Sequence, residues 1–183
     1  MTQDRNLRQR AWYFSKLTAD PKDTNVVWAG NVGGFISKDG GKTWQAIITG
    51  LPAEGYAQTI KEDPLRPGLL FAGTERAVYV SFDDGDHWQS LQLNLPATSM
   101  RDVAVKDNDL ILATHGRGFW VIDDISVLRQ ITDAVAAGEA FLFRPAEAIA
   151  MPAGTDNGTP LQKDEALAEN APNGAVIDYY LKA

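Results

Sequence analysis

The strongest constraint in this sequence is a short polar turn that occurs twice at a fixed spacing. A Ser-x-Asp-x-Gly-x-x-Trp pattern covers residues 37–44 and returns at residues 81–88, so corresponding residues lie 44 positions apart. Two further landmarks, an Asp-Pro pair and an Ala-Gly pair, recur 43 positions apart: Asp20-Pro21 and Asp63-Pro64, and Ala29-Gly30 and Ala72-Gly73. Self-similarity at this period is typical of stacked or radial repeats, and a four-stranded propeller blade has about this length.

Each repeat contains four short runs that favour strands, because β-branched and aromatic residues alternate with turn residues. In the first repeat we expect strands at 11–17, 25–30, 35–37 and 43–48, and in the second at 56–61, 69–73, 77–80 and 87–91. A third repeat opens at Met100 and continues to Asp124, where the glycines and tryptophan of the polar turn are missing. The predicted fold is all-β, with about three four-stranded meanders of a β-propeller. A closed propeller needs about four to eight blades, so we expect an incomplete ring or a fragment.

The remainder of the chain is expected to form an extended C-terminal tail. A short helix is predicted at 128–138, a strand at 139–145 and a last strand at 175–182, with a linker between the two strands. The partner of that last strand is left open: it is either the edge of a blade or a domain outside this chain. The expected domains are a polar segment at 1–10, propeller blades at 11–145, and a linker with the C-terminal strand at 146–183.

Composition excludes several classes of function. The 183 residues carry a net charge of -7 and no run of Lys or Arg, which argues against a nucleic-acid partner. No segment approaches the length of a membrane span, and the first residues lack the apolar core of a signal peptide. The absence of cysteine excludes disulfides and thiolate ligands. No metal or cofactor is expected.

The residues of the polar turn have geometric rather than catalytic reasons to be there. The carboxylate of an Asx turn accepts backbone N–H bonds within its own loop, and glycine supplies positive φ. The tryptophan then packs over the turn. We therefore predict a structural role for the defining residues of both turns, which are Ser37, Asp39, Gly41, Thr43, Trp44, Ser81, Asp83, Gly85 and Trp88.

Residues 37–44 match the Asp-box, or BNR repeat, at every defining position. Residues 81–88 match except that His87 replaces threonine, so one hydroxyl bond is expected to be lost. The pattern resembles the C-terminal blades of large bacterial BNR-repeat proteins, sortilin-like proteins and xyloglucanase-like glycosyl hydrolases. The resemblance implies a secreted or periplasmic protein. It does not imply one activity, because Asp-boxes occur in enzymes, sorting receptors and assembly factors alike.

The most functional-looking stretch is 114–120, in which two glycines flank a cation beside aromatic residues, a composition suited to anion or sugar recognition. The alternative is an ordinary hairpin with a locally paired arginine. If equivalent loops of the three repeats share one face, the predicted ligand-binding residues are Asn31, Glu75, Arg76, His115, Arg117 and Trp120.

Two functions remain open from the sequence. The first is a non-catalytic scaffold for binding or assembly, with carbohydrate or protein as ligand, completed by self-association or by the remainder of a longer chain. The second is part of a glycosyl hydrolase. Such an enzyme needs two carboxylates on either side of the scissile bond. Glu62, Asp63 and Glu75 are nominal candidates, no pair stands out, and the catalytic residues are unknown.

Overall fold

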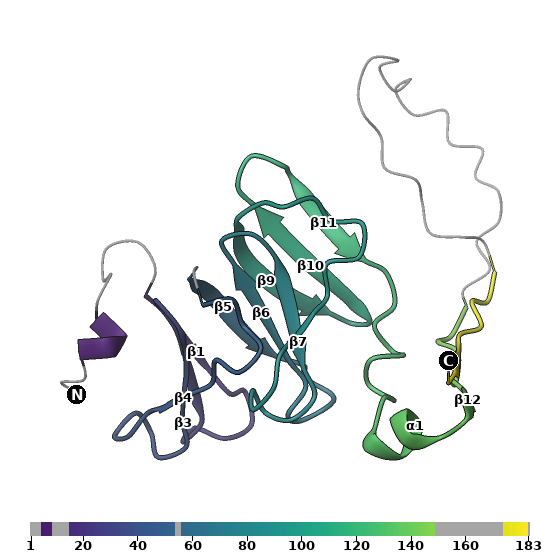
Figure 1. Cartoon of the computed structure of the whole chain (residues 1–183), viewed down its shortest axis with the longest axis horizontal. Helices are drawn as coiled ribbons and strands as arrows, with labels where there is room; N and C mark the ends of the chain where they lie inside the picture. Colours follow the sequence, from purple (N-terminus) through teal and green to yellow (C-terminus); the bar gives the residue numbers. More distant parts are fainter. Residues whose placement is uncertain (1–4, 9–14, 54–55, 149–173, 183) are drawn as a thin grey trace. The chain divides into compact units, whose positions relative to one another are not determined.

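The computed structural model describes residues 5–8, 15–53, 56–148 and 174–182 (Figure 1). The chain divides into two compact units, Met1–Ile125 and Ser126–Ala183, which are described separately here. This division falls after Ile125, and the domain boundary expected at residue 145 stays a prediction. In the described ranges, no helix has the length and apolar character needed to cross a membrane.

The first unit consists of a 3-10 helix and three successive antiparallel meanders. The helix η1 spans Arg5–Arg8. The first sheet contains β1 (Lys16–Ala19), β2 (Val27–Gly30), β3 (Gly34–Ser37) and β4 (Gln45–Ala46), in that order. The second contains β5 (Ala57–Glu62), β6 (Leu70–Thr74), β7 (Val78–Ser81) and β8 (Gln89–Ser90). The third contains β9 (Met100–Lys106), β10 (Asp109–Thr114) and β11 (Phe119–Ile122).

Strand register makes the three sheets equivalent position by position. Each sheet has a leading face, toward the preceding sheet, and a trailing face, toward the following one. One cross-strand row of the leading face reads Leu17–Ala29–Phe35, Ile60–Ala72–Tyr79 and Val103–Leu112–Trp120 in the three sheets. The matching row of the trailing face reads Thr18–Trp28–Ile36, Lys61–Phe71–Val80 and Ala104–Ile111–Val121.

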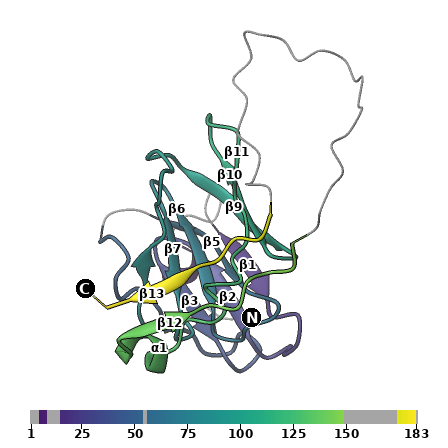
Figure 2. The same ribbon diagram turned by 90° about the vertical axis from the view of Figure 1, so that its right-hand side faces the viewer.

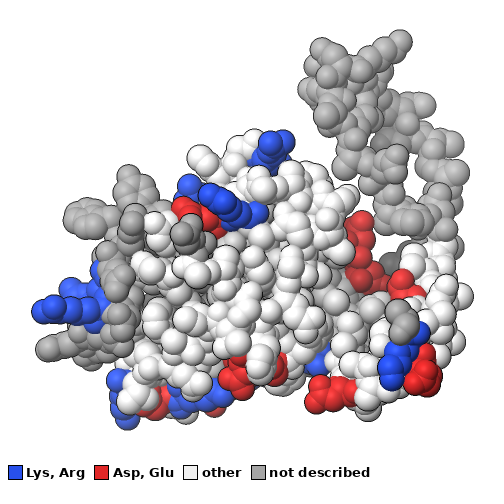
Figure 3. Space-filling view, in the orientation of Figure 1, with Lys and Arg blue, Asp and Glu red and all other residues white. Residues whose placement is uncertain are grey.

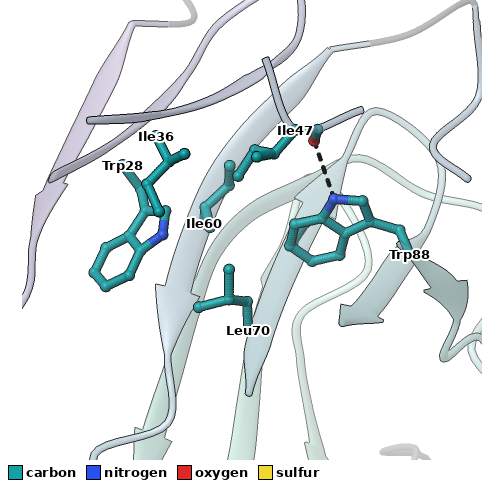
Figure 4. Close-up of a cluster of buried hydrophobic side chains, with 7 residues drawn as sticks. Trp28, Ile36, Ile47, Ile60, Leu70 and Trp88 are labelled. Atoms are coloured by element: carbon teal, nitrogen blue, oxygen red, sulfur yellow. Dashed lines mark hydrogen bonds between the residues drawn. The ribbon is translucent and has the colours of Figure 1, made fainter. Parts of the chain in front are cut away.

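The core forms where the trailing face of one sheet packs on the leading face of the next (Figure 4). Trp28 and Ile36 of the first sheet contact Ile60 and Leu70 of the second, and all four are at most 3% exposed. Burial of such side chains contributes about 25 cal/mol for each Å² of apolar surface removed from water. Apolar contacts between the facing sides of neighbouring sheets therefore hold the sheets together.

Two glycines allow this close packing. A Cβ atom placed on Gly30 would lie 2.4 Å from the carbonyl oxygen of Ala57, and one on Gly73 would lie 2.8 Å from Cβ of Met100. Both distances are shorter than real contacts, so only glycine fits at these positions. The repeated Ala-Gly pair in the sequence thus marks a close approach between neighbouring sheets.

The third sheet differs from the predicted four-stranded meander, because it has three strands in the described residues. After β11 the chain returns to the β9–β10 turn, where the N–H of Ile125 donates to the Asn108 carbonyl oxygen (2.6 Å). The Ile125 side chain is 1% exposed, so its burial favours this return over an outward fourth strand. The predicted fold class is otherwise confirmed: the protein is all-β, with blade-like meanders that do not close into a ring within the described ranges.

The second unit is small. Helix α1 (Asp133–Ala137) begins after Thr132, whose hydroxyl accepts the Val135 N–H, and ends at Gly138. It is shorter than the predicted helix because this cap places the first turn at Asp133. The strands expected at 139–145 and 175–182 are β12 (Ala140–Leu142) and β13 (Tyr179–Leu181), which pair antiparallel (Figure 2). The partner of the last strand, left open by the sequence, is therefore β12.

Candidate functional site

In the first polar turn, residues 37–44, residues of the turn itself donate hydrogen bonds to the Asp39 carboxylate. The Ser37 hydroxyl donates to Asp39 Oδ1 (2.9 Å) and accepts the Gly41 N–H (2.8 Å). The Asp39 carboxylate also accepts the Thr43 hydroxyl (2.6 Å) and the N–H groups of Lys42 and Thr43 (both 2.9 Å). These donors, with the Thr43 hydroxyl first among them, hold the pKa of Asp39 well below its usual range. Every carboxylate oxygen is thus engaged within the turn.

The second polar turn, residues 81–88, has the same plan with one substitution. Ser81 bonds Asp83 and Gly85 as Ser37 bonds its partners. His87 Nδ1 lies 2.6 Å from Asp83 Oδ2, where the first turn has the threonine hydroxyl. The expectation of a lost bond is therefore wrong, because an imidazole nitrogen replaces the hydroxyl. Burial opposes ionisation of Asp83, but the His87 N–H, the His87 ring and Ser81 outweigh it and lower its pKa.

The two tryptophans of these turns are placed differently. Trp44 donates its indole N–H to Gly41 in its own turn (3.2 Å) and is half-buried. Trp88 is 4% exposed and donates to the Ile47 carbonyl oxygen of the preceding repeat (3.0 Å; Figure 4). An ion pair between Lys38 and Asp84 also links the two turns (2.5 Å). The polar turns thus join neighbouring sheets at one end of the first unit.

The predicted ligand-binding residues other than Trp120 lie at the other end, in the hairpin turns that connect β2 to β3, β6 to β7 and β10 to β11. Asn31 closes the first of these turns from inside. It is 1% exposed, its side-chain amide donates to the Leu7 carbonyl oxygen and the Ser15 hydroxyl (both 2.9 Å), and its oxygen accepts the Val32 N–H (2.7 Å). The structure therefore places Asn31 beneath the surface, away from the exposed side chains of the other turns.

The second and third hairpin turns are brought together by the segment that precedes β9. The Thr98 N–H donates to the Arg76 carbonyl oxygen (3.2 Å), and the Thr98 hydroxyl donates to the His115 carbonyl oxygen (3.2 Å). The His115 N–H in turn donates to Ser99 (2.9 Å). Arg76, His115 and Arg117 have exposed side chains along this strip, and Glu75 is half-exposed. In Figure 3, Lys and Arg atoms stand at the upper rim of the first unit, where these turns lie in Figure 1.

Trp120 lies in β11, the strand that follows the β10–β11 turn. Its indole N–H donates to the Arg117 carbonyl oxygen (3.0 Å), which fixes the end of the β10–β11 turn. The Thr114 hydroxyl closes the same turn on the Gly118 carbonyl oxygen (2.7 Å). The arrangement is a rigid hairpin that presents a histidine and an arginine to solvent, which suits recognition of an anionic or hydrogen-bonding ligand.

Two of the nominal catalytic acids, Glu62 and Asp63, interact with groups of their own sheets and turns. Glu62 interacts with the carboxyl group of Asp20, which belongs to the preceding repeat. Burial, with repulsion from Asp20 and Asp84, raises the pKa of Glu62. Asp63 is 1% exposed and accepts the N–H groups of its own turn.

A separate carboxylate, Asp102, links the first strands of all three sheets. It accepts a hydrogen bond from Thr59 (3.2 Å) and pairs with the Lys16 ammonium group (2.5 Å). Burial opposes its ionisation, but Lys16 and the Val103 N–H prevail and lower the pKa of Asp102. Within the residues that the structure describes, no group of three or more metal-binding side chains is present.

The sequence did not predict an apolar pocket that is lined by residues of the first and second repeats, near the hairpin-turn end. It has a volume of about 370 Å³ and is lined by Val32, Phe35, Ile48, Leu51, Tyr56 and Ala57, among others. No motif marks it, because its lining comes from unremarkable positions in two repeats. The sequence signal that could have indicated this pocket is a difference in residue size between equivalent positions of the repeats.

No family model matches this chain, and no curated protein matches it by sequence. Among solved structures, it is similar to an ancestral GH74 enzyme (23% identity, 56% of this chain and 13% of that chain, TM-score 0.49). It is also similar to a GH74 xyloglucanase from Xanthomonas campestris (18% identity, 57% and 20%, TM-score 0.49). A third similar structure is YCF48 bound to D1 peptide (23% identity, 54% and 33%, TM-score 0.40). The chain spans a third or less of the length of each of these proteins.

Proposed function

We propose that the chain is a non-catalytic set of β-propeller blades that acts as a scaffold for assembly and ligand binding. Its polar turns are Asp-boxes in this proposal and serve as structural joints between blades. The internal bonding of Asp39 and Asp83 supports that role, since both carboxylates are occupied by donors of their own turns.

The observation that carries the proposal is the uncovered trailing face of the third sheet. Phe119 is 80% exposed and Val121 is 50% exposed, whereas their counterparts in the second sheet, Val78 and Val80, are 0% and 4% exposed. Exposed apolar surface of this kind marks an interaction site. The repeat indicates the chemistry of the partner, because the equivalent face is covered by the leading face of another such sheet.

We further propose that a second copy of the chain supplies that leading face. The first sheet retains an exposed leading-face residue, Leu17, which is 68% exposed and equivalent to the buried Ile60. A contact between the trailing face of one copy and the leading face of the other, made twice, would give a closed six-bladed ring.

The same scaffold carries the exposed strip of Arg76, His115 and Arg117, for which we propose a carbohydrate or protein ligand with acidic groups. A single carboxylate facing two arginines gains charge-assisted hydrogen bonds, which are stronger than neutral ones. The alternative, a piece of a glycosyl hydrolase, would require a suitably spaced carboxylate pair.

Assembly is tested by sedimentation velocity of the purified chain, with Phe119→Lys and a control. Leu65→Lys is the control, because Leu65 is similarly exposed (66%) but lies in a turn outside the trailing face. We expect the chain and the control to associate and Phe119→Lys to remain monomeric. A wild-type chain that is monomeric at all concentrations would contradict the assembly.

Ligand binding and catalysis are separated by a glycan and acidic-peptide array combined with a hydrolysis assay. Arg117→Ala is compared with Arg129→Ala, which removes an arginine from the second unit. Binding that Arg117→Ala abolishes and Arg129→Ala retains, without turnover, agrees with the scaffold. Turnover of any glycan would favour the hydrolase instead.

A further inference from the structure

We infer that the pocket lined by the first and second repeats is a binding site for an uncharged apolar ring. Its volume of about 370 Å³ lies within the range of small-ligand sites, which are concave and mostly apolar. Ile48 and Val32 line it and remain 52% and 41% exposed. None of the strip residues Arg76, His115 and Arg117 lines this pocket.

Comparison of equivalent positions in the repeats shows that the pocket occurs where the residues at one junction differ from those at the next. Ala57 pairs with Thr74 at the start of β5, as Met100 pairs with Thr114 at the start of β9. Met100 is 0% exposed and fills the junction between the second and third sheets with a long side chain. At the junction between the first and second sheets, Ala57 leaves that volume open.

The outer side of the pocket contains a second difference between the first and second repeats, and this difference also favours an apolar site. The Leu51 N–H donates to Ile48 (3.0 Å) as the Leu95 N–H donates to Gln92 (2.8 Å), so Ile48 and Gln92 are equivalent. The Gln92 side chain folds back onto the Leu95 carbonyl oxygen (2.6 Å) and closes its turn. Ile48 makes the corresponding surface apolar and leaves it facing the pocket.

The lining indicates the class of ligand. Two aromatic side chains, Phe35 and Tyr56, stand in the wall, and flat apolar rings pack well against such groups. The Thr74 hydroxyl, which also lines the pocket, is used to close its own turn on the Ala77 carbonyl oxygen (2.9 Å). A sugar would bring several hydroxyl groups that need partners, whereas an aromatic or alicyclic hydrocarbon group needs none.

The test is a titration of the full-length chain with indole, followed by the methyl resonances of Ile48 and Leu51 in ¹³C NMR. We expect saturable ring-current shifts at these two residues. Ala57→Met, which installs the residue of the equivalent junction, should weaken binding by at least about tenfold, an affinity change that NMR titration resolves readily. Ala134→Met places the same side chain on an exposed position of α1, in the second unit, and should bind as the wild type does.

Ile48→Gln provides a second variant that does not disturb the core, because Ile48 is at the surface. It reproduces the residue of the second repeat and should also weaken binding, with Leu51 as the reporting methyl group. The inference is overturned if the wild-type shifts do not saturate, if methyl groups outside the pocket respond equally, or if both Ala57→Met and Ile48→Gln bind indole as tightly as the wild type.

Discussion

The Trp88 indole N–H donates to the Ile47 carbonyl oxygen at 3.0 Å and thereby joins the second repeat to the first (Figure 4). Trp44 occupies the same position of the earlier turn but donates within that turn, to Gly41. The two tryptophans have different hydrogen-bond partners because a preceding sheet packs against Trp88, whereas Trp44 belongs to the first of the three sheets.

Replacement of Trp88 by phenylalanine should therefore cost more stability than the same change at Trp44. Trp88→Phe leaves a buried carbonyl oxygen without its donor, at a cost of roughly 1–3 kcal/mol in the free energy of unfolding. Trp44→Phe removes a bond at a half-exposed site and should cost less. Urea unfolding of both variants measures the difference, and equal losses would contradict an inter-sheet role for Trp88.

Gly30→Ala should destabilise the junction between the first and second sheets. The new Cβ would lie 2.4 Å from the Ala57 carbonyl oxygen, and overpacking against backbone typically costs roughly 1–3 kcal/mol. The matched control is Ala113→Gly, the reverse change at the equivalent position of the third sheet, which should cost about 0.5–1 kcal/mol through backbone entropy. Thermal unfolding compares the two, and a neutral Gly30→Ala would show that the sheets can move apart at little cost.

Asp83 should make the protein sensitive to acid. Its pKa is lowered on folding, so its stabilising contribution is present above the ordinary value of 3.8 and is lost as the pH falls toward the folded-state value. Asp83→Asn removes this contribution, by about 1 kcal/mol at neutral pH given its partial exposure. The variant should therefore lose less stability than the wild type on acidification, whereas Asp86→Asn, in the same turn, should follow the wild type. Identical pH profiles for all three proteins would argue against the Asp83 network.

Glu62 has the opposite linkage. Its pKa is raised on folding, so its favourable contribution is complete below the ordinary value of 4.5 and is lost as the pH rises through the folded-state value. Glu62→Gln retains an oxygen for the Gly68 N–H (2.9 Å in the wild type) and removes the charge near Asp20. We expect a gain of less than about 1 kcal/mol at neutral pH, because solvent screens the charges, and the gain should shrink in acid. Glu75→Gln is the control, and a gain at every pH would not fit the linkage.

The repeat spacing predicted much of this fold because the polar turn uses local bonds. The bonds of Ser37 and Asp39 lie within five residues, so the sequence pattern alone indicated them. The Ala-Gly pairs likewise recur where neighbouring sheets approach each other closely. The sequence could not show that His87 replaces a hydroxyl with a ring nitrogen, because that depends on a side-chain orientation.

The features that could not be predicted from the sequence depend on contacts between residues far apart in the chain. Asn31 was expected among exposed turn residues, but it follows Gly30 as the buried Thr74 follows Gly73, and Leu7 and Ser15 accept hydrogen bonds from its amide inside. The third meander stops at three strands because Ile125 is buried instead of leading outward. The pocket beside Ala57 arises from the absence of a large side chain, which no motif records.

The central claim, that the third sheet presents an unfinished blade interface to the first sheet of another copy, is tested most directly by disulfide mapping. The chain contains no cysteine, so single substitutions give unambiguous crosslinks. Within the chain, a Cβ on Gly30 would lie 3.1 Å from the Gln58 backbone carbon, and the equivalent pair across the proposed contact is Ala113 with Ser15 of a second copy. After oxidation of an equimolar mixture of Ala113→Cys and Ser15→Cys, we predict crosslinks mainly between the two variants. Crosslinks only between identical variants, or none, would contradict the claim.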